Sequence, residues 1–155
     1  MKRDACIVGN YRYWLYREWD ATKPTIHFVM LNPSTADASV DDPTIRRCIS
    51  FATREGFGSL FVVNLYVWRA TNPDELRNAP DPVGPHNMEF LASIGRAAAG
   101  CETPIVCAWG VAPNAEPVIN LLRDKGAKLV CLGKTKNGSP RHPLYVRADA
   151  PMVPL

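Results

Sequence analysis

Short apolar runs and amphipathic stretches alternate along the chain after residue 25. Four runs have the length of a β strand and are followed directly by Asn, by Gly or by Trp-Gly: residues 25–31, 60–63, 104–108 and 128–132. Between them, apolar residues recur at intervals of three and four, the spacing of one face of an α helix. The pattern therefore predicts strands that alternate with helices.

The first predicted helix has the clearest start signals. Asp42 suits its N-cap and Pro43 its first position, because proline has no backbone N–H to leave unpaired there. Apolar residues follow at i, i+3, i+4 and i+7 over residues 45–52, and Gly56 suits the end of the helix. Similar apolar stripes predict two further helices, over residues 88–98 and 115–122.

Strands that alternate with helices indicate a mostly parallel sheet covered on both faces. Residues 11–19 are rich in aromatic side chains and predict an antiparallel edge strand or a hairpin beside that sheet. We therefore expect a single α/β domain over residues 1–155. Its predicted architecture is a three-layer α/β/α sandwich with a mainly parallel, four-stranded central sheet and an N-terminal antiparallel strand or hairpin.

Composition adds few constraints on partners. The net charge of +3 is mild, so it permits a phosphate-bearing partner without requiring one. The five cysteines form no CxxC pair and no histidine cluster accompanies them, so we expect no metal and no cofactor. Buried, reduced thiols are typical of a cytoplasmic protein. No apolar run is long enough for a membrane helix, and nothing predicts an obligate protein partner.

Polar or glycine residues follow every predicted parallel strand. Right-handed crossovers bring the carboxyl ends of such strands to one edge of the sheet, where ligands of open α/β sheets bind. We therefore expect Asn32, Asn64, Trp109-Gly110 and His142 to lie near one another.

Asn32, Asn64 and His142 have the chemistry of a binding or catalytic site. Asn32 can hold a water molecule, and the planar amide of Asn64 matches the edge of a nucleobase. His142 precedes a proline, which holds its backbone extended and its imidazole in place. Each residue also has a simpler interpretation, since asparagines end strands in turns and single histidines are usually structural.

Neighbouring residues extend this candidate site. Ser34 and Thr35 follow Asn32 and either contact a substrate or form a turn, and Asp37 is a candidate base. Trp109 either packs in the core or forms a pocket wall, and Gly110 permits close approach of a ligand. The loop over residues 134–141 is basic and either contacts phosphate groups or is solvated.

The motif set resembles a family of bacterial and phage proteins known as DUF1643. The matching stretches are residues 31–37, 42–47, 64–66, 69–71, 108–110 and 142–145. More remotely, the order of motifs is similar to the uracil-DNA glycosylase superfamily, in its mismatch-specific branch. Asn32-Pro33, Asn64 and His142-Pro143 match its catalytic, base-reading and carbonyl-polarising motifs, while Met30 and Leu144 depart from it.

This second resemblance implies hydrolysis of an N-glycosidic bond in DNA or a nucleotide, in the context of DNA repair or base modification. Asn32, His142 and Asp37 would be catalytic, and Asn64 would read the base. The remaining implied base- or substrate-binding residues are Ser34, Thr35, Tyr66, Trp109, Gly110 and Tyr145. The implied phosphate-binding residues are Arg46, Arg47, Lys134 and Arg141. Two alternatives stay open: a non-catalytic module that binds nucleotide or nucleic acid, and an enzyme of free nucleosides.

Overall fold

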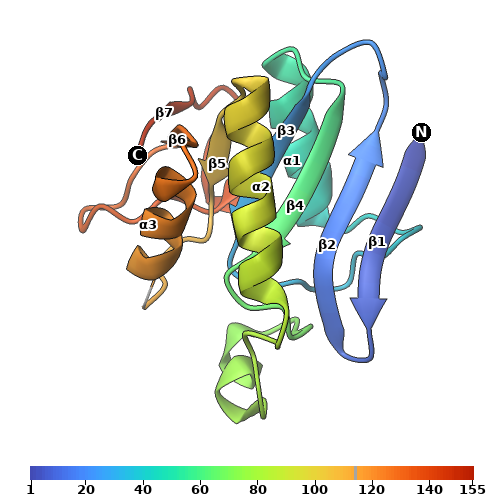
Figure 1. The fold of residues 1–155 in the computed structure, drawn as a ribbon, viewed down its shortest axis with the longest axis vertical. Coiled ribbons are helices and arrows are strands. Elements are labelled where there is room, and N and C mark those ends of the chain that lie inside the picture. The colour runs from blue at the N-terminus through green and yellow to red at the C-terminus, as the bar shows by residue number, and fades with distance from the viewer. Residues whose placement is uncertain (114) are drawn as a thin grey trace.

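The computed structural model describes residues 1–113 and 115–155, except for the side chain of Pro73. The described part is a mixed α/β fold with a seven-stranded sheet and three α helices (Figure 1). The strands are β1 (Lys2–Val8), β2 (Tyr11–Glu18), β3 (Thr25–Met30), β4 (Ser59–Asn64), β5 (Ile105–Cys107), β6 (Leu129–Cys131) and β7 (Val153–Pro154). The α helices are α1 (Pro43–Arg54), α2 (Asn87–Cys101) and α3 (Glu116–Asp124), and the two 3-10 helices are η1 (Pro73–Asn78) and η2 (Pro143–Tyr145).

The strand order in the sheet is β1-β2-β4-β3-β5-β6-β7. Neighbours from β4 to β6 run parallel, whereas β1, β2 and β7 join through antiparallel pairings. The sheet is therefore mixed, with seven strands and more antiparallel than parallel residue pairs, whereas we expected a mainly parallel sheet of four strands beside an N-terminal antiparallel strand or hairpin. The additional strands lie at the edges, where β1 is largely exposed and β7 has only two residues, so neither has a clear apolar pattern.

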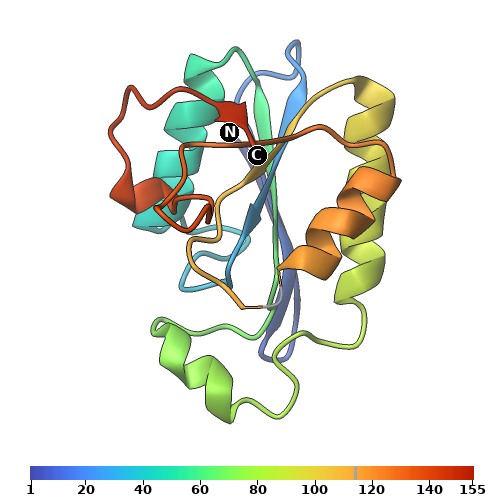
Figure 2. The same ribbon diagram turned by 90° about the vertical axis from the view of Figure 1, so that its left-hand side faces the viewer.

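Helices cover both faces of this sheet (Figure 2). Strand residues alternate between the faces: Ile26, Phe28 and Met30 of β3 pack in a core with α1, whereas Val29 packs in a second core with α2 and α3. The same alternation directs Leu60 and Val62 of β4 toward α1. Because side chains repeat with a period of two, Asn64 also faces the α1 side at the end of β4.

Helix α1 begins where the sequence predicts it. Asp42 is its N-cap, with Oδ1 accepting a hydrogen bond from the backbone N–H of Ile45 at 2.9 Å, and Pro43 is its first residue. Cys48 and Ala52 are fully buried, as the apolar stripe predicts. The helix ends before Gly56, whose φ of +87° is the left-handed conformation that glycine adopts most readily.

The parallel strands leave the sheet at one edge, and the connections there build the site. The crossover after β3 packs α1 on one face, and the crossover after β5 packs α3 on the other (Figure 2). The two connections therefore diverge beside the ends of β3 and β5, which is the position where open α/β sheets bind ligands. The segment after β6 returns over the α1 side and places η2 against α1.

Three further sequence-based expectations concern cysteines, metals and membranes. All five cysteines are free; Cys48, Cys107 and Cys131 are buried, Cys6 is partly buried and Cys101 is exposed. Within residues 1–113 and 115–155, no group of three or more His, Cys, Asp or Glu side chains has the arrangement of a metal site. In the same part of the chain, no helix has both the length and the apolar character needed to cross a membrane.

Candidate functional site

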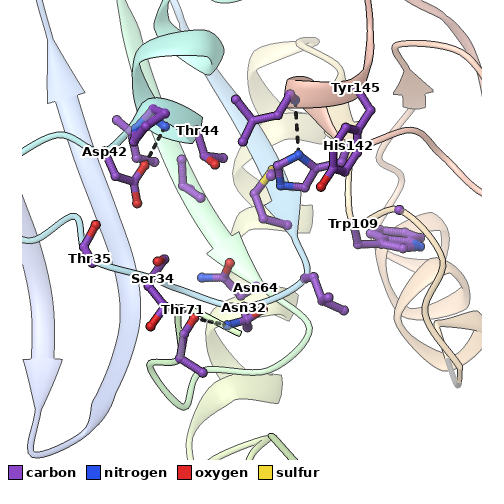
Figure 3. A pocket seen from close by; sticks show the side chains of 18 of the residues that line it. Asn32, Ser34, Thr35, Asp42, Thr44, Asn64, Thr71, Trp109, His142 and Tyr145 are labelled. Atoms are coloured by element: carbon purple, nitrogen blue, oxygen red, sulfur yellow. Dashed lines mark hydrogen bonds between the residues drawn. The ribbon is translucent and has the colours of Figure 1, made fainter. Parts of the chain in front are cut away.

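A pocket of about 640 Å³ opens at the carboxyl edge of the parallel strands (Figure 3). Its volume is in the range of pockets that bind small molecules and cofactors. The segments after β3, β4, β5 and β6 all contribute to its wall, together with the start of α1. Of the residues proposed from sequence, the pocket is lined by Asn32, Ser34, Thr35, Asn64, Trp109, Gly110, Arg141, His142 and Tyr145.

Asn64 is the most unusual of these residues because its side chain is fully buried and unpaired. Its exposed fraction is 0%, and neither Nδ2 nor Oδ1 has a hydrogen-bond partner. A buried polar group without a partner costs about 1–3 kcal/mol. Asn64 lines the pocket beside Met30, its register partner in β3, and no described residue pairs with this amide.

Asn32 has a fixed orientation at the end of β3. Its Nδ2 donates hydrogen bonds to the carbonyl oxygens of Pro33 at 3.0 Å and Ala70 at 2.9 Å. Both amide protons are therefore used, while Oδ1 accepts no hydrogen bond from any described residue. Asn32 thus presents an acceptor to the pocket, which is the polarity needed to hold a water molecule.

His142 has a defined tautomer. Its Nδ1 accepts a hydrogen bond from the backbone N–H of Leu144 at 3.1 Å (Figure 3). Since Nδ1 is an acceptor, the neutral ring carries its proton on Nε2. Burial lowers the pKa of His142 below its ordinary value, although the charge of Asp42 opposes that effect. At neutral pH the residue is a neutral hydrogen-bond donor rather than a cation.

The carboxylate at the pocket belongs to Asp42 and not to Asp37. Asp37 points into its own turn, where its Oδ1 accepts from the backbone N–H groups of Ser39 and Val40 at 2.8 Å each. Asp42 caps α1 and also lines the pocket, and its Oδ2 accepts from the backbone N–H of Ala36 at 3.3 Å. The sequence predicts Asp42 only as a helix cap, and its place in the pocket wall is not predicted.

Two contacts hold the His142 segment over the pocket. The backbone N–H of Gly110 donates to the carbonyl oxygen of Pro140 at 2.8 Å, with Gly110 in a left-handed conformation at φ +74°. Arg47 donates from Nε to the carbonyl oxygen of Pro143 at 3.2 Å and from Nη2 to that of Val146. Its guanidinium also lies 5.3 Å from the centre of the Phe51 ring. Arg47 is therefore an anchor of η2.

The other proposed phosphate-binding residues differ in position. Arg141 is exposed and lines the pocket, and its Nε donates to the carbonyl oxygen of Lys134 at 3.2 Å. Lys134 itself does not line the pocket. Arg46 does not either, and its guanidinium donates to the carbonyl oxygen of Asp41 at 3.1 Å. The structure thus brings one of the four proposed cations to the pocket.

The aromatic residues proposed from sequence also differ in whether they line the pocket. Trp109 is buried and both packs in the α2–α3 core and lines the pocket, so the two roles proposed for it coexist. Tyr145 is 78% exposed at the mouth, with its ring centre 5.5 Å from that of His142. Tyr66 lies outside the pocket, where its hydroxyl donates to the carbonyl oxygen of Pro113 at 3.4 Å.

Sequence reasoning also missed Arg12 and three pocket-lining threonines, Thr44, Thr71 and Thr135. Arg12 lies on β2, its side chain is buried, and its Nε has no hydrogen-bond partner. Burial lowers the pKa of Arg12 to about 10, which leaves it charged at neutral pH. The aromatic-rich stretch over residues 11–19 gives no sign that Arg12 is buried, and the loop after β3 contacts its guanidinium through the carbonyl oxygen of Ala36.

The comparisons with known proteins identify a family without an assigned function. Residues 12–144 match the family described as "Protein of unknown function (DUF1643)". Comparisons with curated proteins and with solved structures found no match. The matched region contains β2, the parallel strands and the pocket-lining histidine. The chain therefore belongs to the DUF1643 family.

Proposed function

We propose that the pocket binds a nucleobase and that the protein cleaves the N-glycosidic bond between that base and its sugar, as a uracil-DNA glycosylase-like enzyme. The observation that carries this proposal is the buried, unpaired amide of Asn64 at the pocket. One acceptor and two donors in a plane match the hydrogen-bonding edge of a base. A base bound there would satisfy the atoms that the folded chain leaves unpaired.

His142 would assist departure of the base. Cleavage leaves negative charge on the ring and carbonyl oxygen of the leaving base. The Nε2–H of a neutral imidazole can donate to that oxygen, and its orientation is fixed in advance by the bond from Leu144 to Nδ1. A preorganised donor of this kind stabilises the transition state without reorganisation.

Asn32 and Asp42 would act on the sugar side. Bond cleavage gives the sugar oxocarbenium character, as in other glycoside hydrolyses. The free Oδ1 of Asn32 would accept a hydrogen bond from the attacking water and direct it. Asp42 supplies the nearby negative charge, in the role for which Asp37 was considered.

A base within duplex DNA would have to leave the stack to enter this pocket. Leu144 and Tyr145 are 45% and 78% exposed beside the mouth and would fill the gap left in the duplex. A free nucleoside or nucleotide would need no such wedge. Binding to DNA should weaken steeply with salt, whereas binding to a nucleoside should hardly change.

Binding without catalysis is the second candidate function, and the state of the pocket's polar groups favours it. The amide protons of Asn32 are bound to backbone carbonyls, and both oxygens of Asp42 accept backbone hydrogen bonds. Asn32 is an amide and cannot act as a base, and the backbone already engages both oxygens of Asp42. On this alternative the pocket reads a base and leaves its bond to the sugar intact.

Base release from defined substrates tests the proposal. The substrates are single- and double-stranded oligonucleotides, each with one variable base including uracil and hypoxanthine, and the corresponding free nucleosides. We expect release from at least one substrate, and a loss of about a hundredfold or more in Asn32→Ala and in His142→Ala. Asn120→Ala and His86→Ala are matched controls, since both residues are exposed and lie outside the pocket.

The possible outcomes separate the two functions. Full activity in Asn32→Ala and His142→Ala would show that the site is wrongly assigned. Tight binding of a base-containing ligand without release would favour the non-catalytic module. If no substrate binds and none is cleaved, both functions fail.

A further inference from the structure

Two buried arginines on β2 differ in how their donors are used. Arg17 forms an ion pair with Asp41 at 2.6 Å and donates four further hydrogen bonds to backbone carbonyls. Among the described residues, the guanidinium of Arg12 donates a single hydrogen bond, from Nη1 to the carbonyl oxygen of Ala36 at 3.0 Å. A guanidinium has five donors, so Arg17 is fully used while Arg12 is not.

Arg12 also has no ion-pair partner among the residues that the structure describes. Within the described part of the chain, no carboxylate oxygen lies within 4.0 Å of its guanidinium. Asp42 is close enough to favour the charged form, but it does not contact Arg12. A buried charge without a paired counter-charge is costly, so an anion beside Arg12 would be stabilised.

A second arginine lies next to this position. Arg69 donates weakly to the carbonyl oxygens of Ser34 at 3.3 Å and Thr35 at 3.4 Å. Arg12 and Arg69 therefore bind three successive carbonyls, those of residues 34–36, and the charge of Arg69 further lowers the pKa of Arg12. Within the part of the chain that the structure describes, Arg69 has no ion pair either.

The segment between the two arginines joins the main pocket to a smaller one. This second pocket has a volume of about 290 Å³ and is lined by Arg69 and Glu75, whereas Arg12 lines the main pocket. The two pockets share Ser34, Thr35, Ala70 and Thr71. The hydroxyl groups of Ser34, Thr35 and Thr71 donate no hydrogen bond to another described residue, so they are available to a ligand (Figure 3).

We propose that Arg12, Arg69 and these three hydroxyls form a phosphate subsite, so that the substrate is a phosphorylated nucleoside rather than a free base or nucleoside. Guanidinium groups bind phosphate through paired N–H donors, and hydroxyls supplement them. The carboxylates nearby are Asp37, Asp42 and Glu75. Asp37 is already bound to its own turn and Asp42 to the start of α1, so both arginines keep free donors.

This subsite rests on the proposed function, because the base must occupy the main pocket for its phosphate to reach residues 34–35. Two ligands supply such a phosphate: a free nucleoside 5′- or 3′-monophosphate, and the backbone of a nucleic-acid strand. Their shared chemistry is a phosphate ester next to the sugar. Mononucleotides and single-stranded trinucleotides with the same central base distinguish them.

Calorimetric titration tests the subsite. The ligands are five 2′-deoxynucleosides (those of A, C, G, T and U), their 5′- and 3′-monophosphates, and matching trinucleotides. We expect phosphate to tighten binding of the preferred nucleoside by about ten- to a hundredfold. In Arg69→Gln and Arg12→Gln this gain, taken as the ratio of nucleotide to nucleoside affinity within the same variant, should fall below about threefold. Arg96→Gln, which removes an exposed charge on α2, should keep the full gain.

Arg69→Gln keeps the test valid if Arg12→Gln fails to fold, because Arg69 is only partly buried. Tighter binding of mononucleotides than of nucleosides would identify a free nucleotide as the ligand. Tighter binding of trinucleotides alone would identify a nucleic-acid strand. Equal affinity for nucleoside, nucleotide and trinucleotide would overturn the subsite and leave the proposed function intact, as would a gain that survives in Arg69→Gln. If no nucleoside, nucleotide or trinucleotide binds, both proposals are overturned.

Discussion

The two faces of the sheet both bury polar side chains, but only one face places them next to a cavity. Unpaired buried polar atoms occur in Arg12 and Asn64, which line the main pocket. They also occur in His27, Asn87 and Thr103, which line neither of the two pockets. The energetic cost is of the same kind on both faces. A ligand can remove that cost only at the pocket. Unpaired polar atoms therefore mark a candidate ligand site where they lie beside a cavity, and a purely structural position where they do not.

The buried His27 on the α2–α3 side should give the largest effect on stability. Burial lowers the pKa of His27 to about 4. The unfolded chain, with a histidine pKa of about 6.5, binds a proton at pH values where the folded chain does not. The free energy of unfolding therefore has its full value above about pH 6.5. It decreases by up to about 3 kcal/mol as the pH falls toward 4, because only the unfolded chain takes up the proton.

Urea unfolding at pH 7.5 and pH 4.5 checks this expectation. His27→Leu should lose much less stability on acidification than the unchanged protein, with a residual slope because the pKa of His142 is also lowered. His86→Leu is the matched control, since His86 is exposed. Equal acid sensitivity of His27→Leu and the unchanged protein would contradict the assignment.

Asn87 should behave as a structural residue although it carries an unpaired Oδ1. Its Nδ2 donates to the carbonyl oxygens of Asn64 at 2.8 Å and Leu65 at 3.2 Å, which ties the start of α2 to the end of β4. Asn87→Leu should therefore lower the free energy of unfolding by about 2 kcal/mol, because buried carbonyls lose their donor. Urea titration measures the loss, and Asn120→Leu at an exposed position of α3 is the control. Unchanged stability would remove the contrast with Asn64.

Arg47 tests whether the pocket depends on an anchored His142. Arg47→Met removes the donors to Pro143 and Val146 and should release η2. We expect about a tenfold loss of kcat for base release, or of ligand affinity if the site only binds, because small displacements of a catalytic group are costly. Arg54→Met is a close control: Arg54 also lies over Phe51, at 5.0 Å, but bonds to Ala148 instead. Equal activity in both variants would show that Arg47 does not position His142.

Local patterns predicted the parts of the fold that local energetics determine. Asp42-Pro43 and the apolar stripe together specify the start and the buried face of α1, and the structure confirms both. The rule that parallel strands share a carboxyl edge predicted that Asn32, Asn64 and His142 converge, and all three line one pocket. Their roles in binding and catalysis stay predictions.

The features that the sequence did not predict depend on contacts between residues far apart in the chain. Met88 was assigned to the buried stripe of α2 but is 44% exposed, and Asn87 is buried in its place, because bonds to the end of β4 determine which side of the helix start is covered. Arg47 has the charge of a phosphate ligand, but the returning η2 segment uses its donors. Arg12 contacts the loop that follows β3 through the carbonyl oxygen of Ala36.

The central claim is that Asn64 is kept at the cost of stability because it reads a ligand, and Asn64→Leu tests it most directly. Leucine has a similar size and leaves no polar atom unpaired. Urea unfolding and calorimetry on the same variant should show an increase of about 1 kcal/mol in the free energy of unfolding, together with loss of nucleobase binding. A loss of stability like that expected for Asn87→Leu, or binding that is unchanged, would contradict the account.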